Sequence, residues 1–166
     1  WRAGADPAPD SPVRVLGCHT DSPGFVLKPQ PDFSAEGWAQ AGVEIYGGPL
    51  LNSWLDRDLE FAGRLVTTDG MEHLTRTGPV ARIPQLAIHL DRDANPGLTL
   101  DRQRHVPPTT AVAAPAVNRI DPPSLLALLA RPAGVAPADL AGTDAPLPDQ
   151  QPPPSIGAHR PPLPPG

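Results

Sequence analysis

Proline occupies 26 of the 166 positions of this chain, and this limits the folds that the chain can adopt. The usual proline content is about 5%. Each proline inside a helix removes a backbone donor and costs about 3 kcal/mol, so a helical bundle over the whole chain is excluded. Prolines are sparse between Phe25 and Leu90 and dense from Pro146 to Gly166. We therefore expect a folded middle region and an irregular, disordered end over residues 146–166.

Charge and composition exclude several classes of function. Thirteen basic and eighteen acidic residues give a formal net charge of -5, with no basic cluster, which disfavours nucleic-acid binding. No run of 18 apolar residues occurs, so no membrane span is expected. The chain starts at Trp1 without a readable signal peptide, and we expect it to be a piece of a longer parent protein. The single cysteine, Cys18, fits a reducing, cytoplasmic location.

Short apolar runs separated by turn residues predict strands rather than helices over much of the chain. All seven aromatic residues lie at or before Phe61, so the aromatic part of the core should form there. One segment, residues 125–130, has a helical pattern: it follows two prolines and Ser124 and closes at Arg131-Pro132. A second short helix is expected near residue 137. The predicted strands are residues 13–17, 25–27, 43–46, 63–66 and 86–90.

The segment Gly-Cys-His-Thr-Asp-Ser-Pro at residues 17–23 contains the most informative side chains. Side chains two apart in an extended chain share a face, so His19 and Asp21 should lie together at the end of the first predicted strand. Imidazole is a common metal ligand, and a carboxylate can orient it through its second ring nitrogen. On this pair alone, a loop histidine satisfied by its neighbouring carboxylate is the favoured interpretation. Cys18 is expected to be a small buried residue rather than a ligand or nucleophile.

A longer series of motifs carries a resemblance to a known family. The order and spacing of the motifs resemble the M18 family of zinc metalloaminopeptidases, the aspartyl aminopeptidase group. The resemblance is strong over residues 13–104 and fainter over 125–157, where the sequence from Asp149 to Pro153 is similar to a segment leading back into the catalytic domain. The matching motifs are His-Thr-Asp-Ser-Pro at 19–23, Leu-Lys-Pro at 27–29, Gly-Val-Glu-Ile-Tyr-Gly-Gly at 42–48, Trp-Leu-Asp-Arg-Asp-Leu at 54–59, Ala-Gly-Arg at 62–64 and Arg-Ile-Pro-Gln-Leu-Ala-Ile-His-Leu at 82–90.

The resemblance implies an α/β fold in which a β-rich dimerisation domain is inserted into a zinc-peptidase catalytic domain. It divides the chain into the start of the catalytic domain (1–27), the dimerisation domain (28–118), a helical return segment (119–145) and the proline-rich tail (146–166). It places the first zinc ligand on His19 and an orienting carboxylate on Asp21. It also implies that His89 reaches the active site of an adjacent subunit, where it can donate a hydrogen bond to the reacting carbonyl and stabilise oxyanion charge. Without the surrounding motif, His89 would be interpreted as a surface histidine on a strand.

The function implied by the resemblance is release of N-terminal, acidic residues from peptide substrates by hydrolysis that two Zn2+ ions assist. A carboxylate would deprotonate a zinc-bound water, which then attacks the peptide carbonyl. The family forms homodimers that build dodecamers. Because this chain has one candidate ligand, and the family's other ligands lie further along than Gly166, we expect the 166 residues alone to be catalytically inactive. A non-catalytic oligomerisation module is the alternative.

Other candidates have weaker support. Asp56-Arg57-Asp58 is interpreted as a structural ion-pair node at a turn rather than a pair of catalytic acids. His73, His105 and His159 are expected to be solvated. The proline-rich tail could recruit a partner as a polyproline helix, but a frameshifted end of the gene would give the same composition, and we favour that interpretation.

Overall fold

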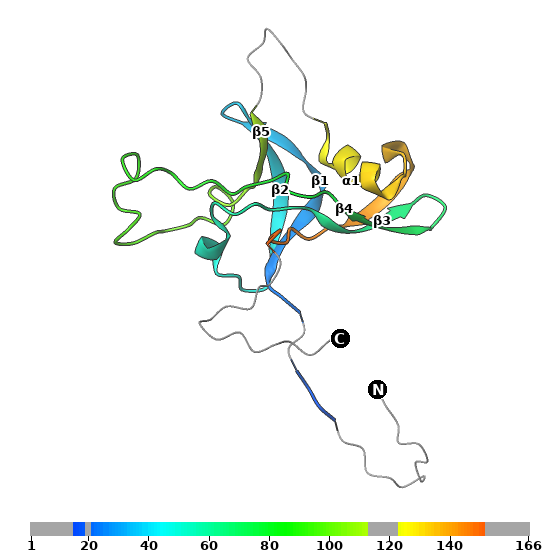
Figure 1. Ribbon diagram of the computed structural model, residues 1–166, viewed down its shortest axis with the longest axis horizontal. Coiled ribbons are helices and arrows are strands. Elements are labelled where there is room, and N and C mark those ends of the chain that lie inside the picture. Colours follow the sequence, from blue (N-terminus) through cyan, green and yellow to red (C-terminus); the bar gives the residue numbers. More distant parts are fainter. Residues whose placement is uncertain (1–14, 19–20, 113–122, 152–166) are drawn as a thin grey trace, which may run out of the picture.

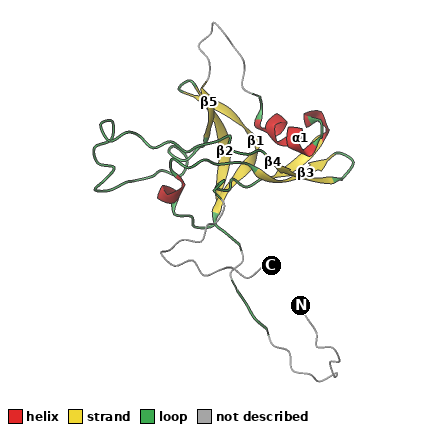
Figure 2. Ribbon diagram, in the orientation of Figure 1, coloured by secondary structure: helices red, strands yellow, loops and turns green. Residues whose placement is uncertain are grey.

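The computed structural model describes residues 15–18, 21–112 and 123–151. The described part contains strands and one α-helix, as expected for a fragment of an α/β protein (Figures 1 and 2). Its strands form two antiparallel three-stranded sheets, ordered β1-β2-β5 and β4-β3-β6. The elements are β1 (Gly24–Ala35), β2 (Trp38–Tyr46), the 3-10 helix η1 (Leu51–Trp54), β3 (Ala62–Thr67), β4 (Glu72–Arg76), β5 (Thr109–Val112), α1 (Leu125–Ala133), the 3-10 helix η2 (Pro137–Asp139) and β6 (Leu140–Asp144).

The first sheet is built on a long hairpin of β1 and β2. Its turn has positive φ at Glu36 and Gly37, a backbone conformation that glycine adopts without steric cost. The pairing is regular from Gly24 to Leu27 and resumes at Asp32. Prolines at positions 29 and 31 lie in this gap. They cannot donate ladder hydrogen bonds, so the gap in the pairing accommodates them. The predicted strands at 25–27 and 43–46 are thus parts of two longer strands.

The second sheet carries the helix. Strand β3, which contains the predicted strand 63–66, pairs with β4 on one edge and with β6 on the other. Helix α1 begins after Ser124, whose hydroxyl accepts a hydrogen bond from the Ala127 N–H at 3.2 Å, and it packs on β4. It continues through Pro132 to Ala133, two residues beyond Arg131, because a proline in the last turn removes only one backbone bond. The helix and the short 3-10 helix at 137–139 agree with the predicted positions.

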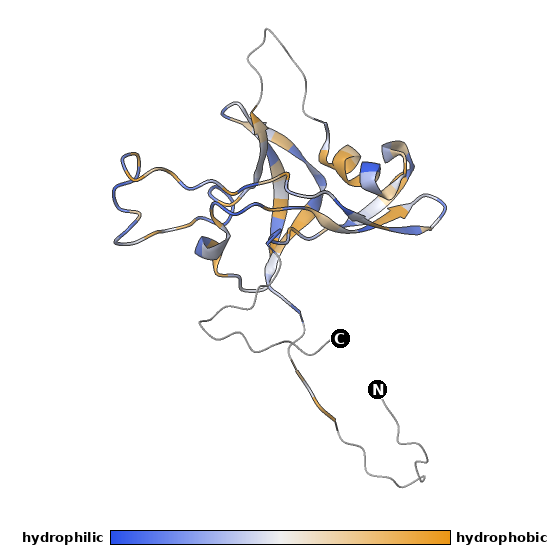
Figure 3. Ribbon diagram, viewed as in Figure 1, coloured by the Kyte–Doolittle hydropathy of each residue, from blue (hydrophilic) through white to orange (hydrophobic). Residues whose placement is uncertain are grey.

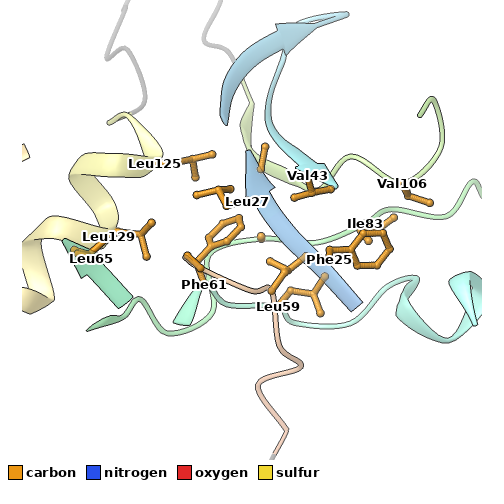
Figure 4. Packing of buried hydrophobic residues seen from close by; sticks show 14 residues of the cluster. Phe25, Leu27, Val43, Leu59, Phe61, Leu65, Ile83, Val106, Leu125 and Leu129 are labelled. Atoms are coloured by element: carbon orange, nitrogen blue, oxygen red, sulfur yellow. The ribbon is translucent and has the colours of Figure 1, made fainter. Parts of the chain in front are cut away.

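The core lies where the two sheets and α1 meet. Phe25 and Phe61 are fully buried, and the ring of Trp54 packs edge-on against Phe25 with centroids 5.1 Å apart. This confirms the predicted position of the aromatic core. Figure 4 shows Phe61 near the middle of the cluster, and Figure 3 shows apolar residues along α1, of which Leu125 and Leu129 are buried. The other large apolar side chains with 4% or less exposure among the described residues are Leu27, Leu59, Leu65, Ile83, Val106, Leu125, Leu129 and Leu147.

Two of the predicted strands are wrong in the residues that the structure describes. Residues 15–17 are exposed and have no regular structure, and Cys18 is exposed rather than buried. A strand needs a neighbouring strand to satisfy its backbone groups, and an apolar run does not specify one. Residues 13 and 14 lie outside the described part. Residues 86–90 end in a turn in which the Leu90 N–H donates to Ala87 O at 2.8 Å.

This turn belongs to a long excursion of the chain, residues 84–108, that we call the 84–108 loop. Figure 1 shows it projecting away from both sheets. Its ends are tied together because Arg82 and Thr109 exchange backbone hydrogen bonds of 3.0 and 2.7 Å. The alternating apolar residues Leu86, Ile88 and Leu90 are largely exposed on it. The loop therefore carries a strand-like sequence without a strand partner among the described residues.

The expected disorder from Pro146 onward is wrong for residues 146–151. This segment lies between the two sheets: the Leu147 N–H donates to Phe25 O at 2.9 Å, and Pro146 O accepts from the Ala62 N–H at 3.2 Å. Pro148 O likewise accepts from Glu60 N–H at 3.2 Å. Pro146 and Pro148 fit this pairing because it uses only their carbonyl oxygens as acceptors. Leu147, which lies between them, supplies the N–H donor. Residues 152–166 lie outside the described part.

The expected domain boundary at residues 27–28 falls inside β1, and the one at 145–146 falls at the start of residues 146–151, which we call the bridging segment. The division into domains itself remains a prediction. Among the described residues, the structure contains no helix with the length and apolar character needed to cross a membrane.

Candidate metal-site segment

Of the two residues expected to build the metal site, His19 and Asp21, Asp21 is the one that the structure describes. The Tyr46 hydroxyl donates a hydrogen bond to Asp21 Oδ2 at 3.1 Å, and both residues are exposed. The pKa of Tyr46 is raised above its ordinary value because the Asp21 carboxylate accepts this hydrogen bond and because its negative charge disfavours the phenolate. Asp21 is therefore tied to the end of strand β2.

The local fold explains why these two side chains meet. Gly24 pairs with Tyr46 at the outer end of the β1–β2 hairpin, which brings the residues just before β1 beside the residues just after β2. There the chain turns at Gly47 with φ +69°, and Gly47 lies so close to Pro23 that an added Cβ would be 3.3 Å from the Pro23 Cβ. Glycine suits this position both for its conformation and for its size.

His19 lies outside the described residues, so its predicted pairing with Asp21 remains a prediction. His89 is described: it is exposed, in the turn of the 84–108 loop rather than on a strand. Asp21 and His89 thus belong to different parts of the fold, the one beside the hairpin and the other on the projecting loop. The predicted role of His89 across a subunit interface also remains a prediction.

No group of three or more His, Cys, Asp and Glu side chains able to hold a metal ion occurs in the part of the chain that the structure describes. Zinc sites use three or four protein ligands. The described residues therefore do not form a zinc site by themselves.

The Asp56-Arg57-Asp58 segment is an ion-pair node, as predicted, although its partners come from elsewhere in the chain. Arg57 pairs with Asp149 of the bridging segment, and Asp58 pairs with Arg82. Asp56 accepts a hydrogen bond from the Gln85 N–H at 3.2 Å. These contacts connect residues 56–58 with the start of the 84–108 loop and with the bridging segment. Their role is structural.

Besides His89, the structure describes two further histidines, His73 and His105. His73 is half-buried on β4, and His105 is exposed, its Nδ1 accepting from the Asp101 N–H at 3.0 Å. His159 lies outside the described residues. A pocket of about 250 Å3 under the 84–108 loop is lined by Leu86, Arg104 and His105 among others, and it is smaller than the usual small-molecule site.

Tyr46 was not singled out from the sequence. The available signal was the Tyr-Gly-Gly sequence at the end of a predicted strand, where a large polar aromatic residue comes directly before a turn.

Comparison with known proteins gives the family of this chain. The family model of the aminopeptidase I zinc metalloproteases (M18) matches residues 1–161, a range that includes most of the proline-rich tail. A probable M18 family aminopeptidase 2 of Streptomyces coelicolor is 44% identical over 162 residues, covering 96% of this chain and 37% of the relative. That of Streptomyces avermitilis is 48% identical over 143 residues, covering 85% of this chain and 32% of the relative. The chain thus spans about a third of the length of these relatives.

Solved structures agree with this assignment. The M18 family aminopeptidase of Thermotoga maritima is similar with a TM-score of 0.64 and 26% identity, over 84% of this chain and 33% of that one. The mApe1 dodecamer of S. cerevisiae is similar with a TM-score of 0.57 and 28% identity, over 80% of this chain and 30% of that one. The sequence relatives and the fold lead to the same conclusion: the chain belongs to the M18 family of zinc aminopeptidases.

Proposed function

We propose that the parent protein, the longer protein of which this chain is a part, is a zinc-dependent aminopeptidase that releases N-terminal, acidic residues from peptides. The observation that supports this most strongly is the family match over residues 1–161, which includes the motifs around His19, Asp21 and His89. The preference for acidic residues comes from the resemblance to the aspartyl aminopeptidase group.

Within this proposal, His19 is a metal ligand and Asp21 orients it through a hydrogen bond to the imidazole. The described residues do not make up a zinc site, so the remaining ligands and the general base are assigned to other parts of the parent protein. When bound, zinc would polarise the peptide carbonyl and activate water. This chain would supply one zinc ligand, His19, and the Asp21 carboxylate that orients it.

His89 is proposed to donate a hydrogen bond to the reacting carbonyl in the active site of a neighbouring subunit. Its exposed position on a projecting loop supports this role, because a residue that acts across an interface must reach beyond its own fold. A dodecamer is among the similar solved structures, and we propose that the parent protein forms homodimers that assemble in the same way. Residues 28–118 would then be the inserted dimerisation domain.

We also propose a cytoplasmic location. Cys18 is free and exposed, which suits a compartment that keeps thiols reduced.

The isolated 166-residue chain is expected to show no turnover of an aspartyl or glutamyl amide in the presence of added zinc, because one ligand cannot hold a catalytic ion. The parent protein, assayed in the same way, should hydrolyse the amide and lose this activity to a chelator. Chelator-sensitive turnover by the isolated chain would contradict the assignment of ligands. A parent protein that is inactive with every aminoacyl amide would contradict the proposed function.

A non-catalytic oligomerisation module remains the second candidate. The large exposed apolar side chains of Leu86, Ile88 and Leu90, close together in the sequence of one loop, favour it, because exposed apolar residues that cluster can form interaction sites. Sedimentation of the parent protein together with its amidase assay separates the two functions: a closed oligomer without turnover supports the module, and an active oligomer supports the enzyme.

A further inference from the structure

The pocket of about 250 Å3 under the 84–108 loop has the size of a small metabolite site. The loop supplies most of its lining, and Gln40 of β2 and Leu55, which follows η1, supply part of the rest. A water molecule takes about 30 Å3 in the liquid, so the pocket has room for roughly eight non-hydrogen atoms. A peptide chain or a nucleotide is too large for this space, whereas a free amino acid such as leucine fills it.

The pocket carries charged groups of both signs. Asp91 lines it at the end of a turn in which the Asp91 N–H donates to Ala87 O at 3.1 Å. Arg104 lines the same pocket from the turn over residues 101–105. Among the described residues, neither the Asp91 carboxylate nor the Arg104 guanidinium has an ion-pair partner. Both groups therefore remain able to pair with a charged ligand.

Asp101 orders the turn that carries Arg104 and His105. Its Oδ1 accepts hydrogen bonds from the N–H groups of Gln103 and Arg104, each at 2.8 Å, so the carboxylate is occupied by backbone donors. The Asp101 N–H donates to His105 Nδ1 at 3.0 Å. A neutral imidazole that accepts at Nδ1 carries its proton on Nε2 and can donate it to an anionic oxygen. The turn thus offers two side-chain donors, the Arg104 guanidinium and His105 Nε2.

Leucine side chains supply the apolar part of the lining. Leu98 and Leu100 are partly buried, and Leu86 is largely exposed. Small-molecule sites commonly combine apolar walls with a few polar groups that fix the orientation of the ligand. A ligand that matches all of this lining has an anionic group, a cationic group and an apolar body. An α-amino acid with an apolar side chain has these three features on a single α-carbon.

We propose that this pocket binds a free apolar α-amino acid such as leucine. Arg104 and His105 bind the carboxylate of the ligand, Asp91 binds its ammonium group, and the leucine side chains of the lining contact its side chain. The site goes beyond the proposed function: it uses no metal, and its ligand is not one of the acidic residues proposed as products. The binding is independent of whether the parent protein is a peptidase.

A ligand series on the wild-type 166-residue chain tests the proposal without any substitution. Leucine is titrated while the backbone amide signals are followed by NMR, and we expect saturable shifts within residues 84–108. Leucinamide, which represents the N-terminal residue of a peptide, lacks the carboxylate, and 4-methylpentanoate lacks the ammonium group. Each should bind about tenfold more weakly than leucine, because each leaves a charged group of the pocket without its partner. Absence of saturable leucine binding, or leucinamide and 4-methylpentanoate binding as tightly as leucine, would overturn the proposal.

Asp91→Asn and Arg104→Gln test the two charged groups separately. Each should weaken leucine binding about tenfold. Arg104→Gln keeps the backbone N–H that donates to Asp101, so the turn is retained. Asp93→Asn and Arg92→Gln are the matched controls, because both are exposed residues of the same loop that do not line the pocket. They should leave the dissociation constant within about twofold of wild type.

The two sets of measurements check each other. Leucinamide should bind the Arg104→Gln variant as it binds the wild-type chain, because the carboxylate that Arg104 recognises is already missing from this ligand. Control variants that weaken leucine binding as much as the pocket variants would show that the ligand responds to the charge of the loop as a whole, and the proposed site would be wrong. If a pocket variant fails to fold, the ligand series on the wild-type chain still decides.

Discussion

Replacing His19 by alanine in the parent protein is expected to lower kcat/KM for an aspartyl or glutamyl amide by more than about a hundredfold. Mutation of a group that merely orients a metal ligand already costs about 10- to 100-fold in affinity or activity, and loss of the ligand itself should cost more. The measurement is steady-state hydrolysis of the amide at saturating zinc.

The matched control is His73→Ala. His73 is a half-buried histidine on β4, paired with Leu65 in the second sheet and far in sequence from the motif segment. It should leave kcat/KM within about twofold of wild type, since His73 lies on β4 and has no place in the proposed site. If His19→Ala and His73→Ala had the same kcat/KM, His19 would not be a metal ligand in this reaction.

Phe61→Ala is expected to lower the free energy of unfolding of the 166-residue chain by about 3 to 5 kcal/mol. The Phe61 side chain is fully buried at the junction of the two sheets and α1, so its removal leaves a cavity that rigid neighbours cannot fill. The measurement is urea unfolding followed by tryptophan fluorescence. A domain of this size has about 5 to 15 kcal/mol of stability in all, so the effect is a large share of it.

Phe33→Ala is the control for this prediction, because it removes the same ring from a position that is 43% exposed. We expect it to cost less than about 1 kcal/mol. If both substitutions destabilised the chain equally, the core would not lie where the two sheets meet.

The sequence predicted those elements whose local pattern and tertiary surroundings agree. Residues 25–27 and 43–46 alternate correctly for a half-buried strand and lie next to each other in the hairpin. The segment from Leu125 is helical because Ser124 caps it and its apolar residues face a sheet. The aromatic core was predictable because the aromatics were confined to one part of the chain.

The failures share a cause: the sequence of a segment does not show which other segment its backbone pairs with. Residues 86–90 have the apolar alternation of a strand, but a strand exists only where another strand satisfies its backbone groups. Conversely, composition predicts disorder for residues 146–151, yet the N–H of Ala62 at the start of β3 and the N–H of Glu60 just before it donate to the carbonyls of Pro146 and Pro148. Propensity describes a segment in isolation, and long-range pairing overrides it.

The candidate site itself remains a prediction, and the sequence indicated only part of what the structure shows around Asp21. Asp21 followed from its spacing to His19 and from the motif, whereas Tyr46 is 25 residues further along and its contact arises only when the hairpin closes. The sequence Tyr-Gly-Gly-Pro at 46–49 signals a turn, but it does not signal that Gly47 packs on Pro23. Contacts made by closing a hairpin become visible only in the structure.

The zinc content of the purified parent protein is the measurement that bears most directly on the central claim, namely that this chain supplies the first metal-binding segment of an M18 aminopeptidase. Elemental analysis should find two zinc ions per wild-type chain and fewer in His19→Ala, with both proteins showing the same far-UV spectrum. A wild-type protein without zinc, or a His19→Ala variant that keeps both ions, would contradict the account.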